Sequence, residues 1–230
     1  MTHFVLVHGA WGGGWVWDDL VTHLEKDGHR VTVVEQLPSA GRDPAALGDL
    51  RADTERVREV VREAGEPVVL VGHSYGGMVV TELADDPGVA HTVYLAAFRP
   101  QRGQSLLGIL GDGPLPPWVW PRDDGNLEVS RDPDVVRAHL CPELSRAQAE
   151  QFIERLCLQS AAAFATPSTA PDPTHPVTYL VCEQDRAIPP EAQEAMATGV
   201  DRVVRLAAPH MAQLTMADRL AEELTAPAPH

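Results

Sequence analysis

The most informative part of the sequence is the stretch Val68-Val69-Leu70-Val71-Gly72-His73-Ser74-Tyr75-Gly76-Gly77-Met78-Val79-Val80. Its first four residues are continuously apolar and mostly β-branched, which is typical of a strand covered on both faces. From Met78 onward the pattern suits a helix, so Ser74 must lie on a tight turn from strand to helix. Gly72 and Gly76 leave out side chains that would collide where the two elements cross. The stretch therefore predicts a serine hydroxyl exposed at the end of a strand, beside backbone N–H groups.

A Gly-x-Ser-x-Gly motif alone is short enough to occur by chance. The alternative is an ordinary strand-to-helix turn in which the serine only caps the helix. The strand before the motif and the helix after it favour a nucleophile turn, because that turn requires both.

Composition and charge narrow the possible partners. The chain has 230 residues, enough for one α/β domain with a sizeable core, and a net charge of −15. That charge argues against binding to nucleic acid or to an anionic membrane surface, since both are polyanions. Lys26 is the only lysine, so catalysis through a lysine Schiff base is disfavoured. No apolar run reaches the roughly 18 residues that a membrane span needs, so we expect a soluble protein without a membrane partner.

Cysteine usage predicts the compartment. Cys141, Cys157 and Cys182 are few, odd in number and irregularly spaced, which is typical of reduced thiols in a cytoplasmic protein. A disulfide between Cys141 and Cys157 is the alternative, although burial as free thiols is favoured. An apolar strand begins almost directly after Met1, with no basic segment or cleavage site before it, which also favours a cytoplasmic location.

Strands and helices alternate along most of the chain. This order predicts a mostly parallel, doubly wound α/β sheet with helices on both faces. Ligands bind such sheets at the carboxyl edge of the strands, which is where Ser74 lies. We assign residues 1–98 and 174–230 to this core, with a closing helix over residues 211–224. Strands are expected at residues 4–7, 31–34, 68–71, 90–97, 176–182 and 202–206.

The alternation breaks between the two parts of the core. Residues 101–125 are rich in Gly and Pro, whereas residues 132–140 and 145–158 have helical patterns, the second opening with Ser145 as N-cap. Long surface loops are the alternative, but unstructured loops of this length are uncommon and the tryptophan-bearing apolar patches need cover. We predict that residues 99–173 form a helical cap, inserted between two strands and lying over the Ser74 edge.

A serine nucleophile needs a base within hydrogen-bond reach and an acid that orients the base. In proteins with this turn the order along the chain is serine, acid, histidine. Asp185 follows the strand ending at Cys182, and His210 follows the last strand, so both loops leave the edge that carries Ser74. Glu183 is the rival acid, and Asp185 is favoured because it lies further into its loop. We predict that Ser74, His210 and Asp185 form a catalytic triad.

Two other histidines compete with His210 as the base. His73 adjoins Ser74, but its side chain is expected to point away and to pack under the turn. His8 is expected to shape the loop after the first strand. The alternative for His210 itself is an ordinary surface histidine.

An anionic intermediate needs preorganised N–H donors. One is the N–H of the residue after the nucleophile, Tyr75, and the other comes from the loop after the first strand. In that loop Ala10 is preferred and Trp11 is the next choice. Residues 12–14 could instead form a phosphate loop, but neither Gly-Lys-Ser/Thr nor Gly-x-Gly-x-x-Gly spacing is present. No His, Cys and Asp cluster has metal-ligand spacing, so we predict no metal.

Four motifs carry a family resemblance: Val7-His8-Gly9-Ala10-Trp11, residues 71–78, Ala96-Ala97-Phe98 and residues 181–189. Together they resemble the α/β-hydrolase superfamily, and more narrowly the plant methylesterase and hydroxynitrile lyase branch with its small bacterial esterase relatives. The resemblance implies the triad named above, an oxyanion hole from Ala10 and Tyr75, and no cofactor.

Within that branch, two positions separate hydrolases from lyases. The lyases that this chain resembles carry threonine where Gly9 stands and lysine where Met211 follows His210. Cyanohydrin cleavage needs that cation to stabilise the departing cyanide, so the resemblance favours hydrolysis.

The sequence thus predicts a serine-dependent hydrolase of small hydrophobic carboxylic esters, with aromatic or methyl esters as candidates. The alternatives are a biosynthetic lyase or cyclase on the same triad, and a ligand receptor that keeps the triad without turnover. A monomer or a homodimer is expected. Core packing would explain each of the expected substrate-binding residues nearly as well; they are Gly9, Trp11, Met78, Trp118, Trp120 and Met211.

Overall fold

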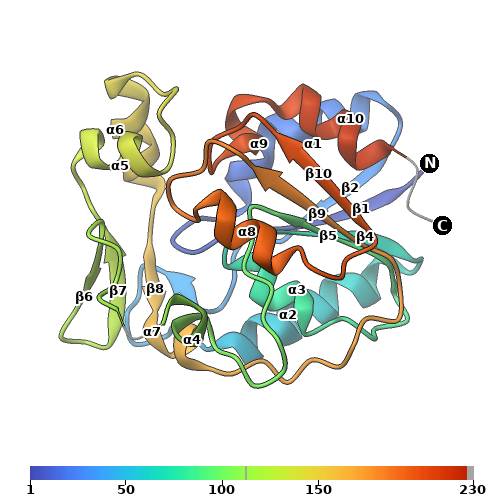
Figure 1. Cartoon of the computed structure of the whole chain (residues 1–230), viewed down its shortest axis with the longest axis horizontal. Coiled ribbons are helices and arrows are strands. Elements are labelled where there is room, and N and C mark those ends of the chain that lie inside the picture. The colour runs from blue at the N-terminus through green and yellow to red at the C-terminus, as the bar shows by residue number, and fades with distance from the viewer. Residues whose placement is uncertain (112, 227–230) are drawn as a thin grey trace.

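The computed structural model describes residues 1–111 and 113–226, and its centre is a six-stranded sheet (Figure 1). The strand order is β10-β9-β5-β4-β1-β2, and every neighbouring pair is parallel. This arrangement confirms the predicted α/β class with a parallel sheet. The strands are β1 His3–Val7, β2 Arg30–Val33, β4 Val68–His73, β5 Val89–Leu95, β9 Val177–Cys182 and β10 Arg202–Leu206.

Helices cover both faces of this sheet (Figure 1). One face is covered by α1, Asp18–Lys26, and α10, Ala217–Thr225, which contact each other. The opposite face is covered by α2, Leu50–Ala64, and α3, Gly76–Thr81. Because all six strands run in the same direction, their carboxyl ends lie along one edge, and the loop after each strand opens there. The remaining helices of the core are the 3-10 helix η1 Gly14–Trp17, α8 Pro190–Met196 and α9 Ala212–Thr215.

The closing helix differs from the prediction. Residues 211–224 form two helices, α9 and α10, that are separated at Met216. Met216 has φ −150° and ψ 49°, outside the helical region, so the helix cannot continue through it. No Gly or Pro marks the break in the sequence.

The segment predicted to be a helical cap contains strands as well as helices. Its helices are α4 Leu106–Leu110, α5 Pro133–His139, α6 Arg146–Arg155 and α7 Ala161–Ala165, and its strands are β6 Val119–Pro121, β7 Asn126–Val129 and β8 Leu158–Ser160. These strands join β3, Ala40–Gly41, in an antiparallel sheet of order β3-β8-β7-β6 beside the core (Figure 1). The sequence did not predict these strands, because strands of two to four residues are too short to show a period.

The two longest helices of this segment, α5 and α6, lie within the predicted ranges 132–140 and 145–158, although α6 already ends at Arg155. Ser145 is the N-cap of α6: its hydroxyl accepts the N–H of Gln148, while the Gln148 side chain accepts the N–H of Ser145. This reciprocal pair is a capping box, which satisfies two otherwise unpaired donors at the helix start. The division into a core, residues 1–98 and 174–230, and a cap, residues 99–173, stays our proposal, and residues 112 and 227–230 of it lie outside the described part of the chain.

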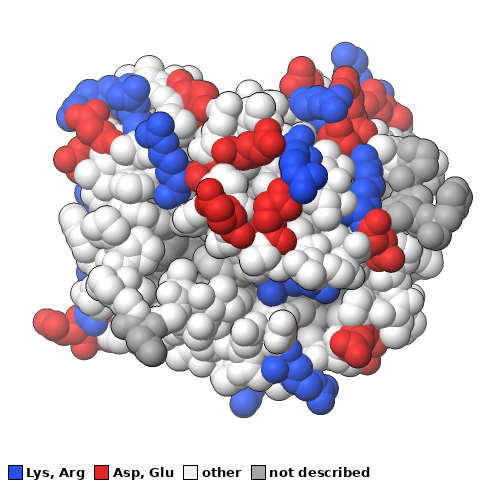
Figure 2. Space-filling view, in the orientation of Figure 1, with Lys and Arg blue, Asp and Glu red and all other residues white. Residues whose placement is uncertain are grey.

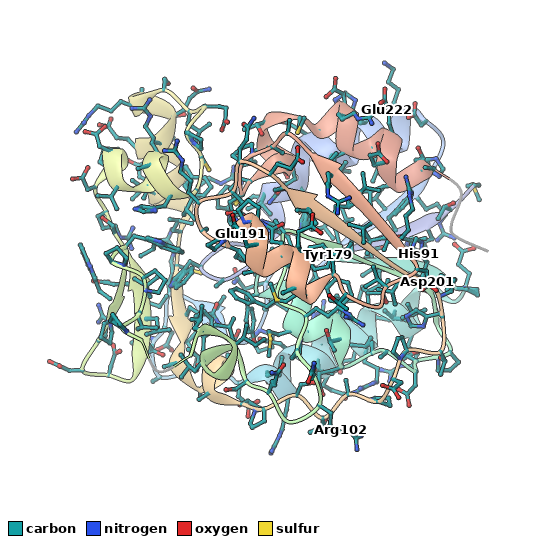
Figure 3. The ribbon with its side chains drawn as sticks, viewed as in Figure 1. His91, Arg102, Tyr179, Glu191, Asp201 and Glu222 are labelled. Atoms are coloured by element: carbon teal, nitrogen blue, oxygen red, sulfur yellow. The ribbon has the colours of Figure 1, made fainter. Side chains whose placement is uncertain are left out.

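Several buried polar side chains are paired, and several charged side chains lie at the surface. Tyr179 of β9 is buried and its hydroxyl donates to the carbonyl oxygen of Ala97, 2.5 Å away, while Arg102, Glu191 and Glu222 point outward (Figure 3). On the face shown in Figure 2, Asp and Glu side chains are interspersed with Lys and Arg. In the described part of the chain, no helix is both long enough and apolar enough to cross a membrane. The cytoplasmic location and the monomeric or homodimeric state stay predictions.

Candidate active site

Ser74 lies on a strained turn between β4 and α3. Its φ is 52°, a left-handed conformation that residues other than glycine adopt rarely. The Ser74 carbonyl accepts the N–H of Gly77 and of Phe98, both at 3.0 Å, and these bonds hold the turn in place. A side chain at Gly76 would place its Cβ only 2.7 Å from the carbonyl oxygen of His8. The glycine is therefore required by the close approach of the first loop to this turn.

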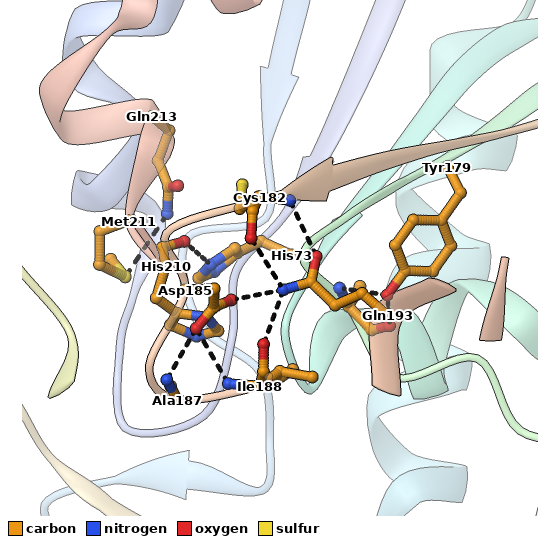
Figure 4. A network of polar contacts seen from close by, with 11 residues as sticks. His73, Tyr179, Cys182, Asp185, Ala187, Ile188, Gln193, His210, Met211 and Gln213 are labelled. Atoms are coloured by element: carbon orange, nitrogen blue, oxygen red, sulfur yellow. Dashed lines mark hydrogen bonds and ion pairs between the residues drawn. The ribbon is translucent and has the colours of Figure 1, made fainter. Parts of the chain in front are cut away.

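His210 and Asp185 form a buried pair at the carboxyl edge of the sheet (Figure 4). The Nδ1–H of His210 donates to Oδ2 of Asp185 at 2.7 Å. Both side chains are buried, and His210 lines the same cavity as Ser74. Glu183, the rival acid, is exposed to solvent. The orientation leaves His210 Nε2 as the ring nitrogen available to a substrate or nucleophile.

The Asp185 carboxylate is held from two sides. Its Oδ1 accepts the N–H groups of Ala187 at 2.7 Å and Ile188 at 2.9 Å. Its Oδ2 also accepts the side-chain amide of Gln193 at 2.9 Å, and Gln193 reaches it from α8 (Figure 4). Gln193 is fully buried, and its Oε1 accepts the N–H of Cys182. These bonds fix the acid before any reaction begins.

Sequence reasoning missed Gln193. It lies on an ordinary helix eight positions after Asp185, and no motif includes it. The only sequence signal is a glutamine on a short helix that follows a candidate acid, which many surface residues would match.

His73 supports the loop of the histidine base. Its Nε2–H donates to the main-chain oxygen of His210 at 3.0 Å, and the two rings lie 4.7 Å apart. Burial, followed by the nearness of His210, holds the pKa of His73 well below its usual range, so the ring is neutral. A neutral ring that donates through Nε2 keeps its lone pair on Nδ1. The expectation that His73 packs under the turn agrees with its burial.

His8 orients the first loop. Its Nδ1–H donates to the Gly9 oxygen at 2.7 Å, and its Nε2 accepts the N–H of Leu37 at 3.1 Å. Burial lowers the pKa of His8 to about 4, so the ring is neutral at neutral pH. The Gly9 oxygen and the Ala10 N–H belong to one planar trans peptide and point in opposite directions. By holding that oxygen, His8 turns the Ala10 N–H the other way.

The N–H groups of Ala10 and Tyr75 are available to an oxyanion, whereas that of Trp11, the second choice in the first loop, is not. The Trp11 N–H donates to Oε1 of Gln159 at 3.3 Å, so it is already engaged. Within residues 1–111 and 113–226, the N–H groups of Ala10 and Tyr75 have no hydrogen-bond partner. Both residues line the cavity that Ser74 enters. The arrangement therefore favours Ala10 over Trp11.

The cavity in front of Ser74 is lined mainly by apolar side chains. Four of the predicted substrate-binding residues line it: Gly9, Trp11, Trp118 and Met211. The sequence did not point to three further lining residues, Leu140, Phe152 and Phe164. The Trp11 ring meets Trp118 and Phe164 edge to face, with centroids 5.7 Å apart in both pairs. Among the lining residues that the structure describes there is no Asp, Glu, Lys or Arg.

Two predicted substrate residues lie away from this cavity. Met78 is completely buried within α3, because it points into the core between helix and sheet. Trp120 is 46% exposed, and its indole N–H donates to the Pro117 oxygen on the outside of β6. The structure therefore gives neither residue a place in the pocket.

The three cysteines are free, and the acidic residues that the structure describes form no metal site. Cys141, Cys157 and Cys182 are buried and free, so the expected reduced thiols are found and the alternative disulfide is not. Over the described ranges, no three His, Cys, Asp or Glu side chains are grouped so that they could hold a metal ion.

Comparison with known proteins places this site in context. The sequence model of the alpha/beta hydrolase family matches residues 4–223. A carbendazim-hydrolyzing esterase of Nocardioides sp. (strain SG-4G) is 42% identical over 125 residues, which are 52% of this chain and only 51% of that protein. Methylesterase 1 of Arabidopsis thaliana is 28% identical over 219 residues, or 84% of this chain and 82% of the relative.

Two further similarities bear on the reaction. An alpha-hydroxynitrile lyase of Arabidopsis thaliana is 38% identical over 105 residues, covering 43% of this chain and 40% of the lyase. The crystal structure of a pyrethroid hydrolase from Sphingobium faniae JZ-2 superposes with a TM-score of 0.82 at 25% identity, covering 98% of both chains. The predicted branch, with plant methylesterases, a hydroxynitrile lyase and bacterial esterases, is thus confirmed.

Proposed function

This chain belongs to the α/β hydrolase family, and on that premise we propose that it is a serine-dependent hydrolase of small hydrophobic carboxylic esters. The observation that carries the proposal is the buried bond between His210 and Asp185, beside a cavity that also holds Ser74. Such an arrangement supplies a base next to a hydroxyl and an acid behind the base.

In the proposed first half-reaction, Ser74 Oγ attacks the ester carbonyl while His210 Nε2 takes the hydroxyl proton. Asp185 keeps the His210 proton on Nδ1 and stabilises the imidazolium that forms. The N–H groups of Ala10 and Tyr75 hold the negative oxygen of the tetrahedral intermediate. The C–O bond to the alcohol then breaks, and His210 returns its proton to the departing alcohol.

In the second half-reaction, water attacks the acyl group on Ser74 and gives a proton to His210. A second tetrahedral intermediate uses the same two N–H donors. It collapses to release the carboxylic acid, and His210 returns the proton to Ser74 Oγ.

The cavity supports an uncharged and hydrophobic substrate. No charged side chain lines it in the described part of the chain, so a charged substrate would lose its hydration without gaining a partner. The rings of Trp11, Trp118 and Phe164 offer edges and faces to an aromatic group. The relatives named for carbendazim and pyrethroid hydrolysis are consistent with such a substrate.

The alternative on the same scaffold is a lyase or a cyclase, and the similarity to a hydroxynitrile lyase keeps it open. Met211 lies at the cavity directly after His210, where a lyase of that type would need a cation. Gly9 lets the first loop approach Ser74 closely, since a Cβ there would lie 2.9 Å from Ser74 Cβ, so the threonine of the lyases would collide at this position. Both observations support hydrolysis. A triad-retaining receptor that binds without turnover is the third candidate.

The test combines labelling with product analysis. A fluorophosphonate probe is expected to label the wild-type protein at Ser74 and to leave Ser74→Ala unlabelled. A panel of aryl and methyl esters is then assayed, and the product masses are measured. Hydrolysis requires a gain of one water per turnover, whereas products without that gain support the lyase or cyclase. Labelling without turnover of any ester supports the receptor, and unchanged turnover by Ser74→Ala overturns the proposed mechanism.

A further inference from the structure

A buried glutamine of the cap strand contacts the loop that carries one oxyanion donor. Gln159 of β8 is completely buried, and both ends of its amide are engaged. Its Oε1 accepts the N–H of Trp11 at 3.3 Å, and its Nε2 donates to the Ser39 hydroxyl at 2.8 Å. Burying an amide costs free energy unless it is hydrogen-bonded, so these two partners specify its position.

Trp11 is a residue whose backbone needs such support. Its φ is 59°, a left-handed conformation that is unfavourable for a bulky side chain. The cap strand region holds it from both sides, because Cys157 N–H donates to the Trp11 oxygen at 2.9 Å while Gln159 accepts the Trp11 N–H. Trp11 directly follows Ala10, so holding the Ala10–Trp11 peptide in place limits the movement of Ala10, whose N–H is the proposed donor.

The contacts continue from Ser39 to the second oxyanion residue. The Ser39 N–H donates to Oδ1 of Asp53 at 2.7 Å, and the Tyr75 hydroxyl donates to Oδ2 of Asp53 at 2.6 Å. Asp53 is a completely buried carboxylate on α2. Tyr75 is thereby held at its ring, while its own N–H is the other proposed donor. A continuous set of buried bonds joins Trp11, Gln159, Ser39, Asp53 and Tyr75.

We propose that Gln159 is a positioning residue for the oxyanion hole, linked through Ser39 and Asp53 to Tyr75. The inference rests on the proposed esterase function. It assigns to the cap a second role besides forming the cavity wall: β8 sets the spacing between the Ala10 and Tyr75 N–H groups. Oxyanion stabilisation depends on donor geometry, so removing this support reduces the reaction rate more than substrate binding.

The principal variant is Gln159→Met, which keeps the length of the side chain and removes both hydrogen bonds. With para-nitrophenyl butyrate as substrate, kcat is expected to fall about tenfold, with KM within about twofold of the wild type. Tyr75→Phe, which removes only the hydroxyl bonded to Asp53, is also expected to reduce kcat. Tyr94→Phe is the matched control, because it removes another buried hydroxyl, bonded to Thr81 and outside this set of contacts.

A second readout separates oxyanion geometry from general damage. An aryl trifluoromethyl ketone adds to the serine and places an oxyanion in the hole, whereas the matching methyl ketone binds without adding. Affinity of Gln159→Met for the trifluoromethyl ketone is expected to fall by the same factor as kcat, with affinity for the methyl ketone unchanged. Equal losses for both ketones, or no loss of kcat in the folded variant, would overturn the proposal.

Two controls keep the outcome interpretable. If Gln159→Met does not fold, Ser39→Ala replaces it, since it removes the Gln159 Nε2 partner and retains the Ser39 N–H bond to Asp53. The wild type is first tested for ester turnover and fluorophosphonate labelling at Ser74. If the wild type fails this test, the esterase function itself is wrong and the proposal fails with it. If the wild type passes and the variants match it, only the role of Gln159 is wrong.

Discussion

The two sides of the cavity are held by different interactions. On the core side, Asp185 accepts four hydrogen bonds, from His210, Gln193, Ala187 and Ile188, and these bonds have defined directions. On the cap side, aromatic rings meet edge to face and define a shape more than a direction. Directional bonds fix atoms for a reaction, whereas apolar contacts accept groups of similar size. Changes to the hydrogen-bonded groups should therefore reduce kcat, and changes to the apolar side chains of the cavity wall should mainly alter KM.

The largest expected effect is that of Asp185→Asn. An amide at this position cannot both accept the His210 Nδ1–H and keep its other bonds, so the imidazole loses its orientation. We expect kcat for an aryl ester to fall by about 10³- to 10⁴-fold with little change in KM. Glu183→Gln, two positions away and exposed, is the matched control and should retain wild-type kinetics. Equal losses in both variants would show that the acid had been assigned wrongly.

The core side of the site was predictable because its residues occupy fixed places in the strand order. Ser74, Asp185 and His210 each follow a strand of the main sheet, and parallel strands bring such loops to one edge. Gln193 and Gln159 could not be found in this way. Their roles depend on which donor or acceptor faces them in three dimensions. A single amide side chain belongs to no motif with a fixed spacing, so the sequence does not identify it.

The cap was less predictable for a different reason. Its helices have capping signals such as Ser145 with Gln148, but its strands are only three or four residues long, and one of them, β8, pairs with β3 from a loop of the core. Short strands are stabilised by their partners rather than by their own sequence. Likewise, the sequence does not show which of the two cap tryptophans, Trp118 or Trp120, faces the cavity.

Gly9→Ala should have the second largest effect. A Cβ at this position would lie 2.9 Å from Ser74 Cβ and 3.1 Å from His73 Nδ1, so either the nucleophile or the loop must move. A displacement on the order of 1 Å can cost about 100-fold in rate, and we expect a loss of kcat of that size. Gly12→Ala is the control, since its Cβ would meet its nearest neighbours at 3.6 Å, an ordinary contact. Retained kcat in Gly9→Ala would mean that this approach is not part of the reacting geometry.

The stability of the core side should depend on pH through His8. Burial lowers the pKa of folded His8 to about 4 from 6.5, so the unfolded chain takes up a proton between these values that the folded chain does not. The free energy of unfolding is therefore highest above pH 6.5 and falls as the pH is lowered towards 4. The loss due to His8 is about 2 kcal/mol at pH 5.

Urea unfolding of wild type and His8→Gln between pH 7 and pH 5 measures this contribution. As the pH falls from 7 to 5, the wild type should lose about 2 kcal/mol more of its free energy of unfolding than the variant does, because the variant has no histidine at position 8 to protonate. Asp53 acts in the opposite direction, because burial raises its pKa to about 6 and its protonation favours the folded state as the pH falls through that value. That effect is common to both proteins and cancels in the difference. A difference independent of pH would mean that His8 is protonated in the folded protein.

The smallest expected effect is on the cap side, where two tryptophans near each other in the sequence serve as a matched pair. Trp118 is 7% exposed and contacts Trp11 in the cavity wall, whereas Trp120 is 46% exposed and lies outside. Trp118→Ala removes apolar surface that an aromatic substrate would contact, so KM for an aryl ester should rise about tenfold with kcat within about threefold. Trp120→Ala should leave both constants unchanged. A fall in kcat of Trp118→Ala as large as that of Gly9→Ala would contradict this comparison, because it would mean that the apolar wall, and not only the hydrogen-bonded groups, fixes the reacting atoms.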